Sequence, residues 1–89
     1  MQPDDEAATA DRLSLADLRV GQRGVVRRFR CTVPLMQRLL EMGLTPGVAV
    51  DVIRLAPLGD PLQVRLRGYY LSLRKAEAKL IDVTLESHP

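Results

Sequence analysis

Cysteine, histidine and aromatic residues are scarce in this 89-residue chain, which has one Cys, one His, no Trp and 3% aromatic residues. The single cysteine, Cys31, cannot form an internal disulfide, and no CxxC pair or Cys/His cluster is present to build a structural zinc site. We interpret Cys31 as a small buried apolar side chain. These absences exclude a disulfide scaffold and a zinc finger.

Long apolar runs are also absent. No stretch approaches the ~18–20 apolar residues that a membrane-spanning helix needs. The first residues, MQPDDEAATADR, are polar and acidic, whereas a signal peptide would be basic and then apolar. We therefore expect a cytoplasmic protein.

The sequence also lacks a catalytic constellation. His88 is the only histidine and lies one residue from the end of the chain. No nucleophile elbow, dinucleotide-binding motif or phosphate-binding loop occurs. The carboxylates Asp51, Asp60, Glu77 and Asp82 are scattered over different predicted elements. We predict that the chain is not an enzyme.

Charge is distributed unevenly along the chain. Residues 1–11 contain four acidic residues and no basic one, whereas the remainder carries 13 basic residues against seven acidic ones. The first segment has no large apolar side chain, so it cannot offset its own ordering entropy. We predict a disordered acidic tail at 1–11, one domain at 12–86 and a flexible C-terminus at 87–89.

The first half of the domain mixes helical and extended patterns. Ser14 and Asp17 fit a capping box at the start of a helix of one or two turns. Residues 21–30 carry the β-branched and aromatic side chains typical of a strand. In residues 32–43, apolar side chains recur at a spacing of three and four, which predicts a helix that ends at Gly43.

The second half alternates polar and apolar residues with period two, which indicates strands at 48–55, within 61–68 (PLQVRLRG), within 69–74 (YYLSLR) and at 81–85. Residues 56–61 (APLGDP) are dense in turn formers and predict a hairpin tip, and Arg67 with Gly68 predicts a second turn. Tyr69 and Leu85 are predicted to face inward. Residues 74–80 favour a short helix before the last strand.

These patterns predict a mainly β fold with short helices. About five short, bent antiparallel strands with one apolar face close best into a small barrel, and we predict an SH3-like barrel with one helix between strands 1 and 2. The helix face made by Leu35, Leu39 and Met42 is predicted to plug one end of that barrel.

Basic strand residues and the hairpin tip are the two candidate binding features. Small barrels can gather outward arginines on one surface, which would attract anionic partners. The alternative is that they are solvated strand exteriors that protect sheet edges. Leu58, at the tip, has no obvious core to enter, although residues 59–61 are also simply good turn formers. The arginines concerned are Arg27, Arg28, Arg30, Arg54, Arg65 and Arg67.

Three phrases in this order resemble the FeoA family of bacterial ferrous iron uptake. They are residues 39–47 (LLEMGLTPG), residues 56–62 (APLGDPL), and Gly68 followed by residues 71–78 (LSLRKAEA). The resemblance extends from about Leu13 to Val83. It implies an SH3-like barrel that acts with FeoB, a membrane permease with a cytosolic GTPase domain, to support Fe(II) import. Contact with the membrane would then be made only through FeoB.

The resemblance also implies a partner-binding site on the hairpin tip and neighbouring arginines. The arginines would add electrostatic steering toward the FeoB cytosolic domain. The residues of this predicted site are Leu58, Gly59, Asp60, Pro61, Arg54, Arg65 and Arg67.

Transition-metal binding, with Fe(II) or Zn(II), is a further implication of the resemblance. The available side chains, Cys31, Glu41, Glu86 and His88, are dispersed along the chain. Fe(II) and Zn(II) prefer imidazole or carboxylate ligands. The metal candidates are Glu86 and His88, which come from the terminal segment and would contribute to a site shared between two chains.

Two alternatives from other classes remain open. One is a metal-responsive regulatory module akin to the SH3-like domain of DtxR-type repressors. The other is a homo-oligomeric scaffold such as a homodimer, because unpaired edge strands favour self-pairing. A nucleic-acid partner is not expected, since the sequence has few aromatic residues to stack on bases and no helix-turn-helix.

Overall fold

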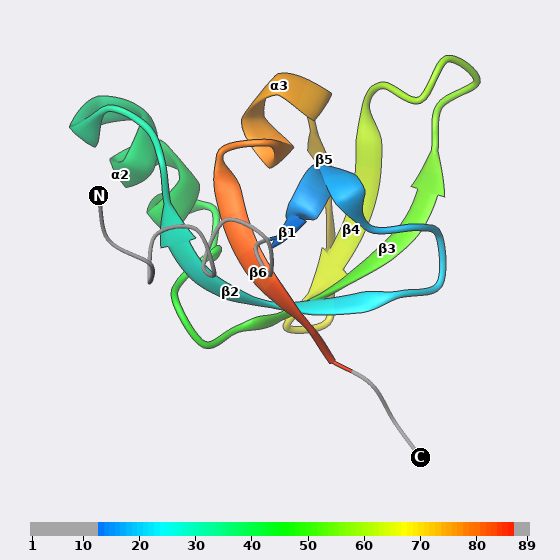
Figure 1. Cartoon of the computed structure of the whole chain (residues 1–89), viewed down its shortest axis with the longest axis horizontal. Coiled ribbons are helices and arrows are strands. Elements are labelled where there is room, and N and C mark those ends of the chain that lie inside the picture. Colours follow the sequence, from blue (N-terminus) through cyan, green and yellow to red (C-terminus); the bar gives the residue numbers. More distant parts are fainter. Residues whose placement is uncertain (1–12, 87–89) are drawn as a thin grey trace, which may run out of the picture.

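The computed structural model describes residues 13–86 and shows a six-stranded antiparallel sheet with short helices (Figure 1). The strands are β1 (Leu13–Ser14), β2 (Arg23–Phe29), β3 (Ala49–Leu55), β4 (Leu62–Leu66), β5 (Tyr69–Leu73) and β6 (Ile81–Glu86). The helices are η1 (Leu15–Asp17), α2 (Val33–Glu41) and α3 (Lys75–Ala78). The predicted mainly β fold is confirmed, with α2 in the predicted place.

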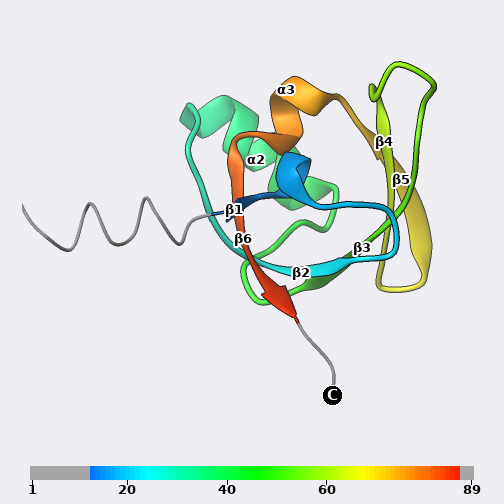
Figure 2. The same ribbon diagram turned by 45° about the vertical axis from the view of Figure 1, so that its right-hand side comes forward.

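The sheet curls around its own core in the order β1-β6-β2-β3-β4-β5 (Figure 2). Its edge strands, β1 and β5, are not paired with each other in the described part of the chain, so the barrel is open. The prediction of about five strands missed β1. This strand has two residues, Leu13 opposite Val83 and Ser14 opposite Asp82, which is too short to show an alternating pattern.

One apolar core fills the curled sheet, and every strand of three residues or more contributes to it. Side chains on alternate strand positions point inward, as period-two patterning requires. The buried apolar residues are Leu15, Leu18, Val26, Leu39, Leu44, Val50, Val52, Leu62, Val64, Leu66, Leu73, Ala78, Ile81 and Val83.

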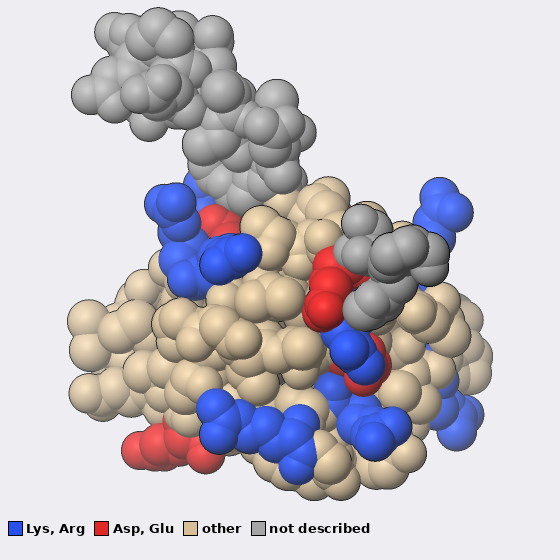
Figure 3. Space-filling view, turned by 90° about the horizontal axis from the view of Figure 1, so that it is seen from below, with Lys and Arg blue, Asp and Glu red and all other residues tan. Residues whose placement is uncertain are grey.

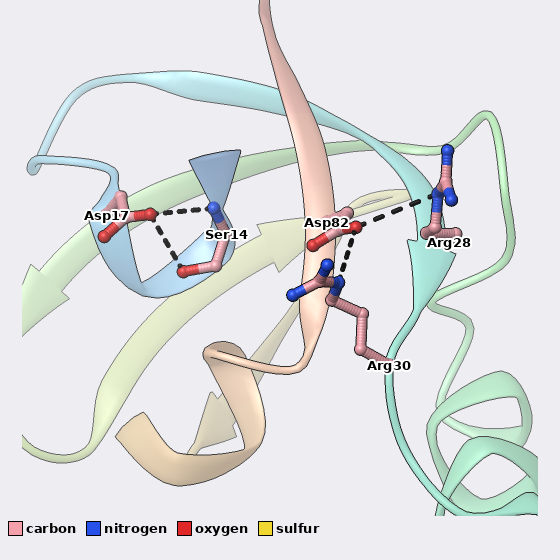
Figure 4. Close-up of polar contacts among 5 residues, drawn as sticks. All are labelled: Ser14, Asp17, Arg28, Arg30 and Asp82. Atoms are coloured by element: carbon pink, nitrogen blue, oxygen red, sulfur yellow. Dashed lines mark hydrogen bonds and ion pairs between the residues drawn. The ribbon is translucent and has the colours of Figure 1, made fainter. Parts of the chain in front are cut away.

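The η1 turn has the predicted capping box. The backbone N–H of Ser14 donates to Asp17 Oδ2 at 2.8 Å, and Ser14 Oγ lies 3.1 Å from the same oxygen (Figure 4). This turn carries buried Leu15 into the core, and buried Leu18 follows it directly. The cap thus positions two core residues ahead of β2.

Helix α2 packs at one side of the core, as its spacing predicted. Leu39 is fully buried, and Leu35 and Met42 pack against the core cluster. Gly43 follows the helix with φ +98°, a left-handed conformation that suits glycine. The longest helix of residues 13–86 is α2, with nine residues, and no helix in this range is long and apolar enough to cross a bilayer.

Two inward assignments were wrong. Tyr69 is 41% exposed, because its hydroxyl lies at the rim of the sheet and donates to the carbonyl of Met42 at the end of α2. Leu85 is 44% exposed and lies opposite Gly24, which has no side chain to pack against it. Inward alternation therefore fails near the rim, where strands lose covering neighbours.

Candidate functional site

The loop at residues 56–61 joins β3 to β4 and projects from the body of the molecule (Figures 1 and 2). Two backbone hydrogen bonds shape it. The N–H of Ala56 donates to the carbonyl of Pro61 at 3.1 Å, and the N–H of Gly59 donates to the carbonyl of Ala56 at 2.7 Å. Gly59 has φ +83°, which glycine adopts without strain. The loop therefore presents its side chains from a defined backbone.

Leu58 is the most exposed large apolar residue in the described part of the chain, with 94% of its surface accessible. Leu55, at the end of β3, is also exposed, as are Pro57 and Pro61. A cluster of exposed apolar side chains on an ordered loop favours contact with another protein. The predicted site residue Leu58 thus lies where a partner could reach it.

Asp60 ties the same loop to helix α3. Its Oδ1 accepts a hydrogen bond at 2.9 Å from the backbone N–H of Lys75, the first residue of α3. The carboxylate therefore satisfies a helix N-terminal donor from 15 residues away in sequence. Sequence reasoning placed Asp60 in the partner contact, and the structure shows that one of its oxygens is used within the molecule.

This contact leads to a prediction about stability. Replacing Asp60 with alanine is expected to lower the free energy of unfolding by about 0.5–2 kcal/mol, the usual effect of losing a helix cap. Asp60→Asn is the matched control, because it keeps an acceptor oxygen and should lose a smaller part of that stability. Urea unfolding followed by circular dichroism measures both. Equal losses in the two variants would show that the Lys75 hydrogen bond contributes little.

Arg54 lies beside the loop, on the outer face of the sheet. It pairs with Gln63, which pairs in turn with Ser72, so one row crosses β3, β4 and β5. Two adjacent hollows of about 260 and 390 Å³ share Pro61 and Ser72. We call this area the tip surface; it comprises Arg54, residues 55–61, Gln63, Ser72 and Arg74.

The other two predicted arginines, Arg65 and Arg67, do not belong to the tip surface. Arg67 follows Gln63 by four residues, which corresponds to about 13 Å along the strand. It begins the turn to β5, and its Nη2 donates to Thr45 Oγ1 at 3.1 Å. Both arginines line a separate hollow with Arg23. The structure therefore divides the predicted site into two places.

Arg28 on β2 and Arg30 just after it lie beside a buried carboxylate, Asp82, which the sequence analysis counted among carboxylates scattered over different elements. Asp82 is 3% exposed. Arg30 Nε lies 3.2 Å and Arg28 Nε 3.8 Å from its Oδ2 (Figure 4). Arg27, at the irregularity in β2, instead donates to Thr84 Oγ1 at 3.0 Å. Charges on β2 are thus partly balanced within the sheet, although basic side chains cover more of the surface than acidic ones in Figure 3.

The metal candidates are not assembled into a site within the described residues. No group of three or more His, Cys, Asp or Glu side chains in residues 13–86 could hold a metal ion. Glu86 ends β6 opposite Arg23, Glu41 is exposed at the end of α2, and Cys31 packs against the core. His88 lies outside the described residues.

The family model and a curated relative identify the same family. The FeoA domain model matches residues 13–85. A fusion of Fe(2+) transport protein A with the Fe(2+) transporter FeoB, from Porphyromonas gingivalis, is 36% identical over 75 residues. That match covers 84% of this chain, which spans 9% of the length of the fusion protein.

Solved structures show the same fold. The FeoA protein of Chlorobium tepidum is 35% identical, with a TM-score of 0.79 over 84% of this chain and 71% of that one. The FeoA of Stenotrophomonas maltophilia, complexed with zinc and described as a prokaryotic SH3 domain protein, is 28% identical, with a TM-score of 0.70 over 80% of this chain and 88% of that one. The predicted SH3-like fold is therefore confirmed.

A manganese-dependent transcriptional repressor complexed with manganese has a TM-score of 0.77 at 18% identity, over 84% of this chain and 37% of that one. At this identity the likeness extends to the fold alone, so it gives no argument for a regulatory function.

Proposed function

Because this chain belongs to the FeoA domain family, which is linked to ferrous iron transport, we propose that it is an accessory protein that docks on a FeoB transporter. The related fusion protein supports this partner, since there the two components form one chain. The observation that carries the proposal is the tip surface, where Leu58 is 94% exposed on a loop held by internal hydrogen bonds.

Docking on this surface combines an apolar anchor with nearby positive charge. Leu58 would enter an apolar pocket of the partner, which is how a few side chains supply most of the affinity of an interface. Arg54 and Arg74 border the loop, and in the described part of the chain neither guanidinium group has a carboxylate oxygen within 4 Å. They would speed association with an acidic partner face, an effect that salt weakens.

The proposed action of the chain is a shift in the conformational population of FeoB. Binding can favour a transport-competent state only to the extent that the chain has a higher affinity for that state than for the other. The chain would act on the cytoplasmic side of the membrane and contact lipid only through FeoB. Fe(II) is then the cargo of the partner, and self-association into a homodimer stays a prediction from sequence.

A resident metal is not part of this mechanism. The zinc complex of the Stenotrophomonas maltophilia protein is a property of that protein. In this chain, residues 13–86 provide no cluster of three ligands. Docking through Leu58 needs no such site, so partner binding should not change when the protein is treated with a chelator.

Leu58→Glu tests the docking surface. The variant is expected to weaken binding to the cytosolic domain of FeoB by ~10-fold or more, because a charge cannot enter an apolar pocket without a partner. Val33→Glu is the matched control: Val33 is 59% exposed on α2, away from the tip, and its replacement should change affinity by less than about twofold. Isothermal titration calorimetry measures affinity, and circular dichroism checks folding. Unchanged affinity in a folded Leu58→Glu variant would refute this surface.

A further inference from the structure

A second hollow lies on the outer face of the sheet, apart from the tip surface. It has a volume of about 220 Å³ and spans β2, β3, β4 and the turn after β4. Its charged lining consists of three arginines, Arg23, Arg65 and Arg67, and one carboxylate, Asp51. The proposed docking of Leu58 does not use this hollow, so its ligand is a separate question.

Strand register determines which of these charges meet. Arg23 on β2 lies opposite Asp51 on β3, and Asp51 lies opposite Arg65 on β4. One carboxylate therefore stands between two guanidinium groups in a row across the sheet. On its other side Arg65 faces Tyr70 of β5, which brings no negative charge. Beyond Arg23 the row continues to Glu86 on β6, so the charge balance at the hollow depends on which arginine pairs with Asp51.

Asp51 is held by Arg23 through both of its oxygens. Arg23 Nε donates to Oδ1 at 2.6 Å and Nη2 donates to Oδ2 at 3.3 Å, a two-point pair. This hydrogen bonding, with the attraction of the Asp51 charge, raises the pKa of the Arg23 guanidinium. Within residues 13–86, Arg65 has no carboxylate within 4 Å. The N–H groups of the Arg65 guanidinium therefore remain available to a ligand in the hollow or to solvent.

Arg67 adds a third guanidinium that is also not neutralised. Arg67 and Gly68 form the turn into β5 with φ +51° and +85°. The hydrogen bond from Arg67 Nη2 to the hydroxyl of Thr45 orients the side chain without cancelling its charge. Glu86 lies on the far side of Arg23 and does not line the hollow. Among the lining residues, once Asp51 is counted against Arg23, two positive charges remain, on Arg65 and Arg67.

We propose that this hollow binds a phosphoryl group, with Arg65 as its main ligand and Arg67 as the second. Guanidinium groups match phosphate oxygens in a two-point geometry, and arginine is the residue most suited to this recognition. A phosphoryl dianion balances both remaining positive charges, whereas a single carboxylate balances one. The hollow is open to solvent, so the group can be inorganic phosphate or the end of an organic phosphate.

A phosphate titration of the full chain tests the site. Backbone amide shifts are followed by NMR at constant ionic strength, with sodium chloride replaced by sodium phosphate. Saturable shifts are expected at Ala49, Asp51 and residues 65–68. Arg65→Gln should weaken binding by ~10-fold, since a charge-assisted hydrogen-bond pair is lost. Arg54→Gln is the matched control, because it removes the same charge from the tip surface and should change affinity by less than about twofold.

Two results would overturn the proposal: shifts that do not saturate, or equal weakening by the two arginine variants, which indicates net charge alone. A second arm compares inorganic phosphate, glycerol 3-phosphate and acetate. Tighter binding of glycerol 3-phosphate supports an organic phosphate, and tighter binding of inorganic phosphate supports the free anion. Acetate binding as tightly as both would contradict a phosphoryl site. Each outcome is independent of Leu58 and of the docking on FeoB.

Discussion

Replacing Leu39 with alanine is expected to lower the free energy of unfolding by about 2–5 kcal/mol. Leu39 is fully buried and is the only residue of α2 in the buried core. Its loss would leave a cavity that the surrounding strands can fill only in part. Because small domains have a total stability of roughly 5–15 kcal/mol, this one substitution removes a large share of it.

Leu40→Ala is the matched control for Leu39→Ala. The two leucines are neighbours on the same helix, so helix propensity changes equally, but Leu40 is only half-buried and lies outside the core cluster. We expect a loss below about 1.5 kcal/mol for Leu40→Ala. Urea unfolding followed by circular dichroism measures both. Similar losses would mean that α2 is not attached to the core through Leu39.

The Leu39→Ala variant also separates stability from docking. The tip surface is built on β3, β4, β5 and the residue before α3, with no contribution from α2. The folded fraction of the variant should therefore bind FeoB with the affinity of the parent chain. A weakened affinity per folded molecule would place part of the interface on α2.

Replacing Gly43 with alanine is expected to lower the free energy of unfolding by about 2–5 kcal/mol, from two sources. Gly43 has φ +98°, a conformation that costs an L residue roughly 1–2 kcal/mol. In addition, an alanine Cβ would overlap the hydroxyl of Tyr69, which donates to Met42 directly before Gly43. Overpacking of this kind typically adds about 1–3 kcal/mol.

Gly47→Ala separates the two sources. Gly47 has a similar φ of +94°, but an added Cβ there would meet nothing within 4 Å. The Gly47→Ala variant should lose only the stability that comes from the backbone conformation, about 1–2 kcal/mol.

Tyr69→Phe removes the overlapping oxygen and should therefore be better tolerated in the Gly43→Ala background than in the parent chain. Thermal and urea unfolding of the four chains in this double-mutant cycle give the coupling. Strict additivity would contradict a steric contact.

Local patterns predicted most of the elements, because each depends on neighbours in sequence. The spacing of Leu35, Leu39 and Met42 placed α2, and the turn formers in 56–61 placed the β3–β4 loop. Ser14 with Asp17 gave the cap of η1. These features follow from the two periodicities of the backbone and from turn chemistry, which act over a few residues.

The candidate site was predicted less completely. Leu58 was identified because a large apolar residue in a hairpin tip has no core to enter, and the structure shows it exposed. Arg54, Arg65 and Arg67 were grouped by charge, but strand positions separate the last two from the loop. The hydrogen bond from the Lys75 N–H to Asp60 could not be predicted from the sequence, because residues 60 and 75 come together only in the tertiary structure.

The sequence by itself determined most of the elements, the family and the distribution of charge along the chain. Only the tertiary structure decided which charges neutralise one another. Asp51 forms its ion pair with Arg23, 28 residues away, and Asp82 pairs with Arg28 and Arg30. The physical reason is register: it sets which side chains stand opposite across strands distant in sequence, and Coulomb attraction is large only at that short range. Register also places Arg65 opposite Asp51, but both Asp51 oxygens pair with Arg23, so Arg65 has no carboxylate partner within the described residues.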